Sequence, residues 1–431
     1  MKVLIIGGGT AGWITALSLY KDHNVTLVES DVPTIGVGES TTDYVVQWLK
    51  NKLDINDFFS KTNSTIKLGV QFDNWKDNDT YFHLFGDKED LVPNNKFDNV
   101  VRYCYQNNIN LDSLSIFEKS RSNLQQWDST AMHWDSVKVP EYIKNFLGDK
   151  ITYKYARVKE VNNFNKTINN IILDDNSILE ADLYIDCTGF NRVLSKALGI
   201  KWNSWDSTGQ VDTALVWQQP HTEELPLYTQ SESWDAGWRW KIPTKDRLGF
   251  GYVFDSSSIN EEQATQEIRS RTNYQGPVRK VMFNTGVVEE QWINNLLHLG
   301  LSSHFIEPLE ATNFDFLIFN LENLDKVLDN TLTKQQYNNQ AVEFANSIRQ
   351  FLKLHYLTGK QDTEFWSKQQ TPHWLKDTLK NIAQGKPSPN SGPFTDYNWY
   401  KIAQGIGLRP MDKNSDSELL ALYQIAVTQK D

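Results

Sequence analysis

Cysteine is scarce in this sequence. Among 431 residues only Cys104 and Cys187 carry thiols, which is too few for a disulfide framework or a cysteine-built metal site and is typical of the reducing cytosol. Basic charge is also in deficit, because 43 Lys and Arg stand against 54 Asp and Glu and leave a net charge of -11. A chain of this charge is not expected to bind nucleic acid or an anionic membrane surface.

Long apolar runs are missing as well. No segment approaches the ~18 consecutive apolar residues that a membrane-spanning helix requires. The N-terminus, MKVLIIGGGTAGW, starts like a signal peptide, but its glycine triplet and the lack of a small-residue cleavage pattern argue against export. We therefore expect a cytoplasmic protein that does not contact a membrane.

Tryptophan, by contrast, is abundant. The fifteen tryptophans serve either core packing or a site that handles flat aromatic rings. Two of them lie in WRWKIP, and residues two apart on a strand point to the same side, so Trp238 and Trp240 are predicted to share a face. As an isolated pattern, such a pair would simply cap a sheet. Pro243 is expected to end the strand because it has no N–H to donate.

The order of apolar patterns predicts an α/β chain. A strand, a helix and a second strand are predicted at residues 2–6, 10–21 and 24–29. Strand patterns return in residues 151–189, and residues 210–254 alternate like antiparallel strands with a turn at TKDR. From Trp292 onward the pattern is helical, with a long helix at about residues 334–357. These elements predict one interwoven unit that opens with a Rossmann-like βαβ segment.

The segment GGGTAGW carries a dinucleotide-binding pattern. Gly7, Gly9 and Gly12 form G-x-G-x-x-G between the predicted strand and helix. Glycines at these positions allow a tight turn and let the backbone approach a pyrophosphate at the positive end of the helix. Glu29 ends the second strand, where a carboxylate binds ribose hydroxyls.

The segment LYIDCTGF favours FAD over NAD. An apolar strand that ends in Asp186 and a Thr-Gly turn occurs where many FAD enzymes complete the flavin site, and the alternative is an ordinary buried strand and turn. No second G-x-G-x-x-G lies between a predicted strand and helix, so no NAD(P)H site is evident. Electrons for the flavin are therefore expected to come from another protein.

Four separated segments resemble the flavin-dependent tryptophan halogenase family. GGGTAGW matches the glycine motif of that family including Trp13, and GVGEST (residues 36–41) resembles its flavin-contacting loop. WRWKIP matches its W-x-W-x-I-P signature, and FIEPLEATNF (residues 305–314) resembles the segment that carries its glutamate and halide site. Together they span residues 1 to about 330.

The resemblance implies a Rossmann-like FAD-binding fold of the aromatic-hydroxylase type. Residues 1–330 would form a composite FAD and halide module, with FAD parts at about 1–80, 150–200 and 290–330 and an inserted antiparallel sheet at about 205–285. Residues 331–431 would form a helical C-terminal region on the substrate side. The oligomeric state is left open, and a homo-oligomer is compatible with the sequence.

The resemblance also implies the cofactors and partners. They are FAD as FADH2, O2, a halide ion, a small aromatic substrate and a separate NAD(P)H-dependent flavin reductase. No metal is implied. The implied cofactor-binding residues are Gly7, Gly9, Thr10, Ala11, Gly12, Glu29, Gly38, Ser40, Val158, Asp186, Leu301 and Phe314.

Two catalytic residues are carried over from the family. There, the flavin and O2 oxidise halide to hypohalous acid, which an essential lysine captures before it attacks an aromatic ring. IKLGVQFDNW places this role on Lys67, whose apolar neighbours Ile66, Leu68 and Val70 alternate with it as on a strand. EPLE places the glutamate at Glu310, which would activate the oxidant or accept the ring proton. The alternative is a structural ion pair between the two side chains.

The halide site is implied at Thr312 and the backbone of Asn313. The family commonly has Ser-Thr-Gly after the glutamate, whereas this chain has Ala311-Thr312-Asn313. We expect Asn313 to take the left-handed backbone conformation nearly as well as glycine. Halide contact through the backbone N–H would then survive, in a pocket of altered size.

The substrate side is implied at YFHLFG, through His83 and Phe85. A hydrogen-bonded core histidine is the alternative at His83. Because the C-terminal region is shorter than in the enzymes that halogenate free tryptophan, a more open site for an indole, a phenol or another electron-rich ring is implied. The shared face of Trp238 and Trp240 would separate the flavin from that substrate. A flavin monooxygenase and a non-catalytic FAD-binding redox or scaffold protein are the competing functions.

Overall fold

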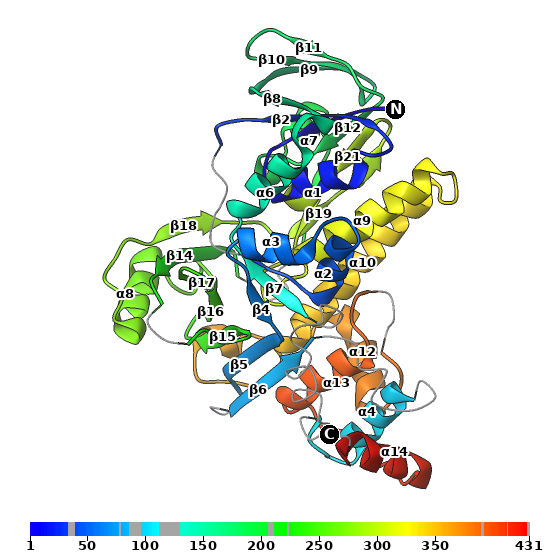
Figure 1. Ribbon diagram of the computed structural model, residues 1–431. Coiled ribbons are helices and arrows are strands. Elements are labelled where there is room, and N and C mark those ends of the chain that lie inside the picture. Colours follow the sequence, from blue (N-terminus) through cyan, green and yellow to red (C-terminus); the bar gives the residue numbers. More distant parts are fainter. Residues whose placement is uncertain are drawn as a thin grey trace.

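The strand, helix and strand predicted at the N-terminus form as expected (Figure 1). In the computed structural model, β1 (Lys2–Ile6) and β2 (Asn24–Glu29) pair in parallel, with α1 (Thr10–Leu19) between them. All of β1 except its first residue is buried, as is typical of a strand covered on both faces. The structure describes residues 1–32, 39–76, 79–85, 96–111, 130–205, 211–221, 224–388, 392–411 and 413–428.

Six strands form the sheet around β1. From edge to edge they are β20 (Trp292–Ile293), β21 (Leu296–His298), β12 (Leu183–Asp186), β1, β2 and β8 (Thr152–Tyr155). All neighbouring pairs are parallel except β20 with β21. The carboxyl ends of β12, β1 and β2 therefore meet at one edge, which is where open α/β sheets bind their ligands.

Shorter elements surround this sheet. α6 (Lys138–Leu147) packs on α1, and α7 (Val193–Ala197) packs on β12. A small antiparallel sheet of β9 (Val158–Phe164), β10 (Thr167–Leu173) and β11 (Ile178–Leu179) lies at the top of Figure 1. Another three-stranded sheet contains β13 (Trp202–Ser204), β19 (Gly286–Val288) and β22 (His304–Phe305).

A seven-stranded sheet forms the second large element. Its strands, in spatial order, are β18 (Arg279–Met282), β14 (Thr213–Gln219), β17 (Leu248–Phe254), β16 (Gly237–Pro243), β15 (Thr229–Trp234), β5 (Gly69–Lys76) and β6 (Asp79–Leu84). The predicted TKDR turn joins β16 to β17, and the N–H of Thr244 donates to the carbonyl of Arg247 at 2.8 Å. The sheet is wider than the segment at 205–285, because β5 and β6 add to its edge through a parallel pairing of β5 with β15.

A short sheet connects the two large ones. It consists of β3 (Glu39–Ser40), β7 (Ala131–Trp134) and β4 (Thr65–Lys67). Beside it lie α2 (Asp43–Lys50), which packs on β7, and α3 (Ile55–Lys61). Lys67 is the last residue of β4, so this sheet sets the position of the predicted catalytic lysine.

The C-terminal region is helical, as predicted. Its helices are α9 (Asn313–Leu328), α10 (Lys334–His355), α11 (Glu364–Ser367), α12 (Lys376–Ala383), α13 (Asp396–Gly405) and α14 (Ser417–Thr428). Two further helices, α4 (Phe97–Gln106) and α8 (Glu261–Thr272), come from earlier in the chain. Residues of α10, α11 and α13 share one hydrophobic core with the seven-stranded sheet, so no core boundary falls at residue 330. None of the helices in the described ranges is long and apolar enough to cross a membrane.

Candidate active site

The glycine turn after β1 is shaped by close backbone contacts. Gly7 has φ 116°, and a Cβ on it would lie 2.2 Å from the carbonyl oxygen of Cys187. A Cβ on Gly12 would lie 1.9 Å from the carbonyl oxygen of Gly7, whereas one on Gly9 would meet no atom of the described residues within 4 Å. The fold itself therefore requires Gly7 and Gly12. Gly9 begins α1 without a side-chain cap and leaves open space at the positive end of the helix.

The carboxylate of Glu29 lies against this turn. A Cβ on Gly8 would come within 2.3 Å of Cγ of Glu29, so glycine makes room for the side chain. Oε2 of Glu29 accepts a hydrogen bond from the hydroxyl of Tyr153 at 3.0 Å and lies 3.8 Å from Nζ of Lys144. These partners hold the carboxylate where dinucleotide-binding folds place a ribose.

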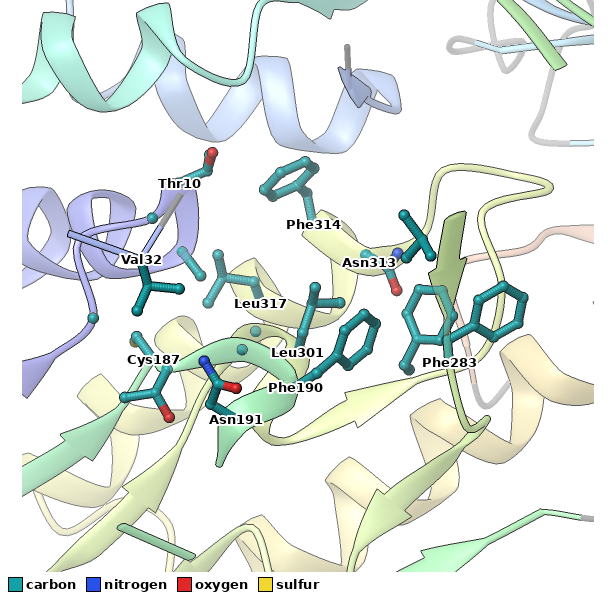
Figure 2. A pocket seen from close by; sticks show the side chains of 18 of the residues that line it. Thr10, Val32, Cys187, Phe190, Asn191, Phe283, Leu301, Asn313, Phe314 and Leu317 are labelled. Atoms are coloured by element: carbon teal, nitrogen blue, oxygen red, sulfur yellow. The ribbon is translucent and has the colours of Figure 1, made fainter. Parts of the chain in front are cut away.

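A cavity of about 660 Å³ extends from the glycine turn to the seven-stranded sheet (Figure 2). This volume lies within the ~300–1,000 Å³ typical of small-molecule sites. Figure 2 shows Thr10 and Phe314 on one side of the cavity, across from Cys187 and Asn191. The predicted cofactor residues that line it are Gly7, Gly9, Thr10, Ala11, Glu29, Ser40, Val158, Leu301 and Phe314. The open space at Gly9 and the fixed carboxylate of Glu29 fit the pyrophosphate and ribose of FAD.

Gly12 and Asp186 are not among the residues that line this cavity. The carboxylate of Asp186 accepts from the backbone N–H groups of Thr188, Leu194 and Ser195 at 3.0, 3.0 and 3.1 Å. Asp186 therefore stabilises the turn of Thr188 and Gly189, which does line the cavity. Its own carboxylate oxygens are used in these hydrogen bonds to the backbone. Gly38 lies outside the described residues.

Two hydroxyl groups in the cavity wall belong to a chain that sequence reasoning missed. Ser40 Oγ lies 3.2 Å from Oγ1 of Thr229, which lies 2.9 Å from Nε2 of His133. Thr65 donates its one hydroxyl proton to the carbonyl of Pro243, so it accepts from Nδ1 of His133. Burial lowers the pKa of His133 and keeps the ring neutral. Nε2 then accepts from Thr229, and Ser40 donates to Thr229 and keeps its lone pairs for the cavity.

Lys67 is fully buried and lines the same cavity. Nζ of Lys67 donates to the carbonyl of Thr41 at 2.9 Å and lies 4.2 Å from the ring centroid of Phe85. Burial lowers the pKa of Lys67 to about 7, although the charges of Glu310 and Asp315 act in the opposite direction. Amine and ammonium forms are therefore both present near neutral pH. Lys67 is therefore not a solvated surface lysine.

Glu310 is buried between two imidazoles. Its Oε1 accepts from Nδ1 of His83 at 2.9 Å and from Nε2 of His355 at 2.8 Å. Burial opposes ionisation, but the two imidazoles together lower the pKa of Glu310 to about 2. Oε2 has no hydrogen-bond partner among the described residues. The side chain is therefore a carboxylate with one oxygen free to accept a proton.

The orientation of His83 is set by α13. Oδ1 of Asn398 accepts the two capping bonds at the start of that helix, so its Nδ2 donates to Nε2 of His83 at 2.7 Å. Nδ1 of His83 therefore carries the proton that Glu310 accepts. The ring of His83 also lies 5.4 Å from that of Phe85, which in turn contacts Lys67. His83 is thus both a hydrogen-bonded buried histidine and a neighbour of the predicted catalytic pair.

Lys67 and Glu310 come to one buried region without pairing. Within the described ranges no ion pair joins them, and the partners of the carboxylate are His83 and His355. The alternative of a structural ion pair is therefore not what the structure contains. Sequence reasoning missed His355, which carries no motif and lies at the end of α10.

The left-handed residue after Glu310 is Ala311. It has φ 60°, whereas Asn313 is the first residue of α9, so the expectation of a left-handed Asn313 is wrong. The N–H of Ala311 donates to the carbonyl of Pro308 at 3.2 Å, and this turn bends the chain before the helix begins.

The positive end of α9 lies at the cavity. Asn313 and Phe314 of its first turn line the cavity, whereas Thr312 is buried and is not among the lining residues. No side chain of the described residues caps the helix, so the N–H groups of the first turn can serve an anion. Of the two predicted halide residues, only Asn313 therefore reaches the cavity wall.

The prediction that Trp238 and Trp240 share a face is confirmed. Both line the cavity, with ring centroids 6.0 Å apart, and β16 ends at Pro243 as expected. Trp240 lies over Gly251, where a Cβ would come within 2.0 Å of its ring. Glycine on β17 therefore makes room for a large ring at the wall.

Comparisons with known proteins agree with this geometry. The tryptophan halogenase family model matches residues 2–420. A tryptophan 6-halogenase of Streptomyces toxytricini is 29% identical over 501 residues, covering 100% of this chain and 93% of that protein. A tryptophan 7-halogenase of Lentzea aerocolonigenes is 28% identical over 415 residues, covering 85% and 78%.

Solved structures give the same result. A tryptophan halogenase from Shewanella frigidimarina has a TM-score of 0.90 at 25% identity, covering 100% of this chain and 93% of the other. A flavin-dependent halogenase from Xanthomonas campestris has a TM-score of 0.86 at 25% identity, covering 100% and 94%. The cavity beside the glycine turn and the buried Lys67 agree with these matches. We conclude that this chain belongs to the tryptophan halogenase family, flavin-dependent oxidoreductases that use FADH2, O2 and halide.

Proposed function

We propose that this protein makes hypohalous acid at its reduced flavin and passes it, by way of Lys67, to an electron-rich aromatic ring. The observation that best supports this route is the buried amine of Lys67 in the wall of the cavity that also contains the glycine turn. When bound, the reduced flavin with O2 supplies the two-electron oxidation that converts halide to hypohalous acid. The residues around it bind the halide, hold the oxidant and accept the ring proton.

The halide is proposed to bind at the start of α9. Asn313 and Phe314 line the cavity there, and within the described part of the chain no side chain caps the helix. Backbone N–H donors at the positive end of a helix suit a small anion. Ala311 takes the strained backbone position and so brings the helix start to the cavity wall.

Lys67 is proposed to hold the oxidant. Among the described residues its Nζ has one hydrogen-bond partner, the carbonyl of Thr41, so further donors remain for a hypohalous acid. With a pKa of about 7, the same nitrogen is also a nucleophile in part of the population near neutral pH. Both capture by hydrogen bonding and capture as a haloamine are compatible with this nitrogen.

Glu310 is proposed to accept the proton that the halogenated ring loses. Its Oε2 is the oxygen without a partner among the described residues, and two imidazoles keep the group ionised. A carboxylate of low pKa is a weak base, but it is sufficient because a ring that has gained a halogen cation is a strong acid. The ring would lie beside Phe85 and His83, which contact Lys67 and Glu310 respectively.

We propose an indole or phenol-like ring as the substrate. The relatives from Streptomyces toxytricini and Lentzea aerocolonigenes halogenate tryptophan according to their names, and Phe85 offers an apolar ring surface beside Lys67. Trp238 and Trp240 are proposed to keep this substrate away from the flavin. A separate flavin reductase would supply the electrons, because the sequence holds a single glycine motif between a strand and a helix.

A reconstituted assay tests this function. The protein is incubated with FAD, a flavin reductase, NADH, bromide and a panel of indoles and phenols, and products are examined by mass spectrometry. We expect the isotope pair of bromine in the wild-type product, and no such product from Lys67→Met with FAD binding retained. Lys380→Met, an exposed lysine on α12, is the control and should behave as wild type. A single added oxygen would indicate a monooxygenase, and bromination by Lys67→Met would exclude the lysine route.

A further inference from the structure

A buried hydrogen-bonded chain lies behind Trp238. Nε1 of Trp238 donates to the hydroxyl of Tyr356 at 2.9 Å, and that hydroxyl donates to Oε2 of Glu307 at 2.9 Å. Trp238 is 1% exposed, and the other two residues are 0% exposed. Three segments far apart in the sequence supply them, namely β16, the end of α10 and the stretch before Glu310.

The direction of this chain is fixed by chemistry. An indole N–H can only donate, so the hydroxyl of Tyr356 accepts from Trp238 and gives its single proton to Glu307. The ring of Tyr356 is stacked on Trp366 at 5.9 Å and lies edge-on to Trp75 at 5.6 Å. The hydroxyl therefore cannot leave Trp238 without a movement of these packed rings.

The other tryptophan of the wall is held differently. Nε1 of Trp240 is buried and has no partner among the described residues. Its ring is held by packing over Gly251. Trp238 is thus the one of the two whose ring plane is set by a hydrogen bond.

We propose that Tyr356 and Glu307 are positioning residues that hold the indole of Trp238 in the cavity wall. The inference rests on the proposed function in one respect, since the wall is taken to separate cofactor from aromatic substrate. The structural part concerns the protein alone and can be tested without cofactor.

Two members of this chain, Glu307 and Tyr356, are titratable. Among the described residues, Lys353 is the charged side chain that acts on Glu307. Burial raises the pKa of Glu307 to about 8, against the opposing effects of Tyr356 and Lys353, while burial lowers the pKa of Lys353 to about 8. Nζ of Lys353 donates to Oε1 of Gln369 at 2.9 Å and lies 5.8 Å from the ring centroid of Tyr356. Since a charged acceptor makes the stronger bond, ionisation of Glu307 tightens the chain.

The first experiment uses the cofactor-free protein with 15N-labelled tryptophan. The indole N–H resonance of Trp238 is identified by its loss in Trp238→Phe. In Tyr356→Phe we expect this resonance to move upfield and the proton to exchange with water about tenfold faster, as for the loss of one hydrogen bond. Tyr337→Phe is the matched control, because the hydroxyl of Tyr337 is buried without a partner among the described residues. An unchanged resonance in Tyr356→Phe, or the same change in Tyr337→Phe, overturns the proposal.

A pH titration separates Glu307 from Lys353. The Trp238 resonance should shift with a midpoint near 8 in the wild type and at a higher pH in Lys353→Met, where the opposing cation is gone, and should stay constant in Glu307→Gln. A titration that survives in Glu307→Gln and is lost in Lys353→Met overturns the assignment to Glu307.

The role of this chain in catalysis is tested by measuring how tightly NADH consumption is coupled to halogenation. In Tyr356→Phe, the yield of halogenated product per NADH consumed should fall and hydrogen peroxide release should rise, while FAD affinity should equal that of the wild type. The control Tyr337→Phe should match the wild type in all three quantities. If the wild type halogenates nothing, the proposed function fails, but the resonance measurements still show whether Tyr356 and Glu307 hold the indole of Trp238. If the resonances change and coupling does not, the positioning role is overturned.

Discussion

The imidazole of His355 donates from Nε2 to Oε1 of Glu310 at 2.8 Å. The other nitrogen of the same ring, Nδ1, lies 2.9 Å from the carbonyl oxygen of Phe351. Both oxygens can only accept, so the ring carries a proton on each nitrogen and its charge balances the buried carboxylate. The proposed proton acceptor of the reaction is therefore kept ionised by a residue 45 positions further along the chain.

Removal of this charge is expected to destabilise the protein strongly. In His355→Gln a donor remains but the charge is lost, so an uncompensated carboxylate stays buried and the free energy of unfolding should fall by about 3–5 kcal/mol. Urea unfolding at pH 7 measures the change. His304→Gln is the control, because His304 is also buried but contacts the ring of Phe316 and, among the described residues, pairs with no carboxylate. Similar losses in the two variants would contradict the charge argument.

The pair of Glu310 and His355 also predicts how the free energy of unfolding changes in acid. The pKa of Glu310 is about 2 in the folded protein and ~4.3 in an unfolded chain, so its contribution is present above ~4.3 and is lost as pH falls towards 2. The difference in unfolding free energy between wild type and His355→Gln should therefore be constant from about pH 5 to pH 6, below the range in which unfolded histidine loses its proton, and should narrow below ~4.3. A difference that widens in acid would refute this sign.

In alkali, Lys67 predicts a second range of pH in which stability rises with pH. Its pKa is about 7 when folded and ~10.4 when unfolded, so between these values the unfolded chain binds a proton that the folded chain has lost. Stability should thus rise with pH relative to Lys67→Met, by at most about 1.4 kcal/mol per pH unit. Urea unfolding at several pH values between 7 and 10 measures it. The plot of unfolding free energy against pH for Lys380→Met should run parallel to that of the wild type. If the plot for Lys67→Met were also parallel to that of the wild type, this would contradict a buried amine at Lys67.

Ala311 offers a test of backbone strain. Its φ of 60° costs a residue with a Cβ ~1–2 kcal/mol, so Ala311→Gly should stabilise the protein by about 0.5–1 kcal/mol after the entropy cost of glycine. Ala341→Gly, in the interior of α10, should instead destabilise by about 1 kcal/mol or more. Thermal unfolding compares the two, and destabilisation by Ala311→Gly would show that the position is not strained.

The glycine turn separates folding from cofactor binding. Gly9→Ala places a Cβ in open space, so thermal unfolding of the cofactor-free protein should be unchanged while FAD affinity falls at least about tenfold. Gly7→Ala forces a contact of 2.2 Å at φ 116°, and should lower stability even without FAD. Equal effects of the two substitutions on cofactor-free stability would contradict this division.

The order of elements near the N-terminus could be predicted because its rules are local. Glycine spacing, strand alternation and the ring of Pro243 act within a few residues, and β1, β2 and the end of β16 lie where these patterns predicted them. The resemblance placed Lys67 and Glu310, because it compares short motifs. It did not place Ala311, because the turn at Pro308 decides which residue takes the left-handed conformation.

Local sequence patterns were enough to predict the glycine turn, the shared face of Trp238 and Trp240 and the general order of strands and helices. Long-range contacts were needed to show that β5 and β6 complete the seven-stranded sheet, that His355 pairs with Glu310 and that Tyr356 accepts a hydrogen bond from Trp238. The physical reason is that a buried charge or donor takes whichever partner folding brings within 3 Å. The pKa of Lys67 likewise depends on how completely distant segments exclude water from it.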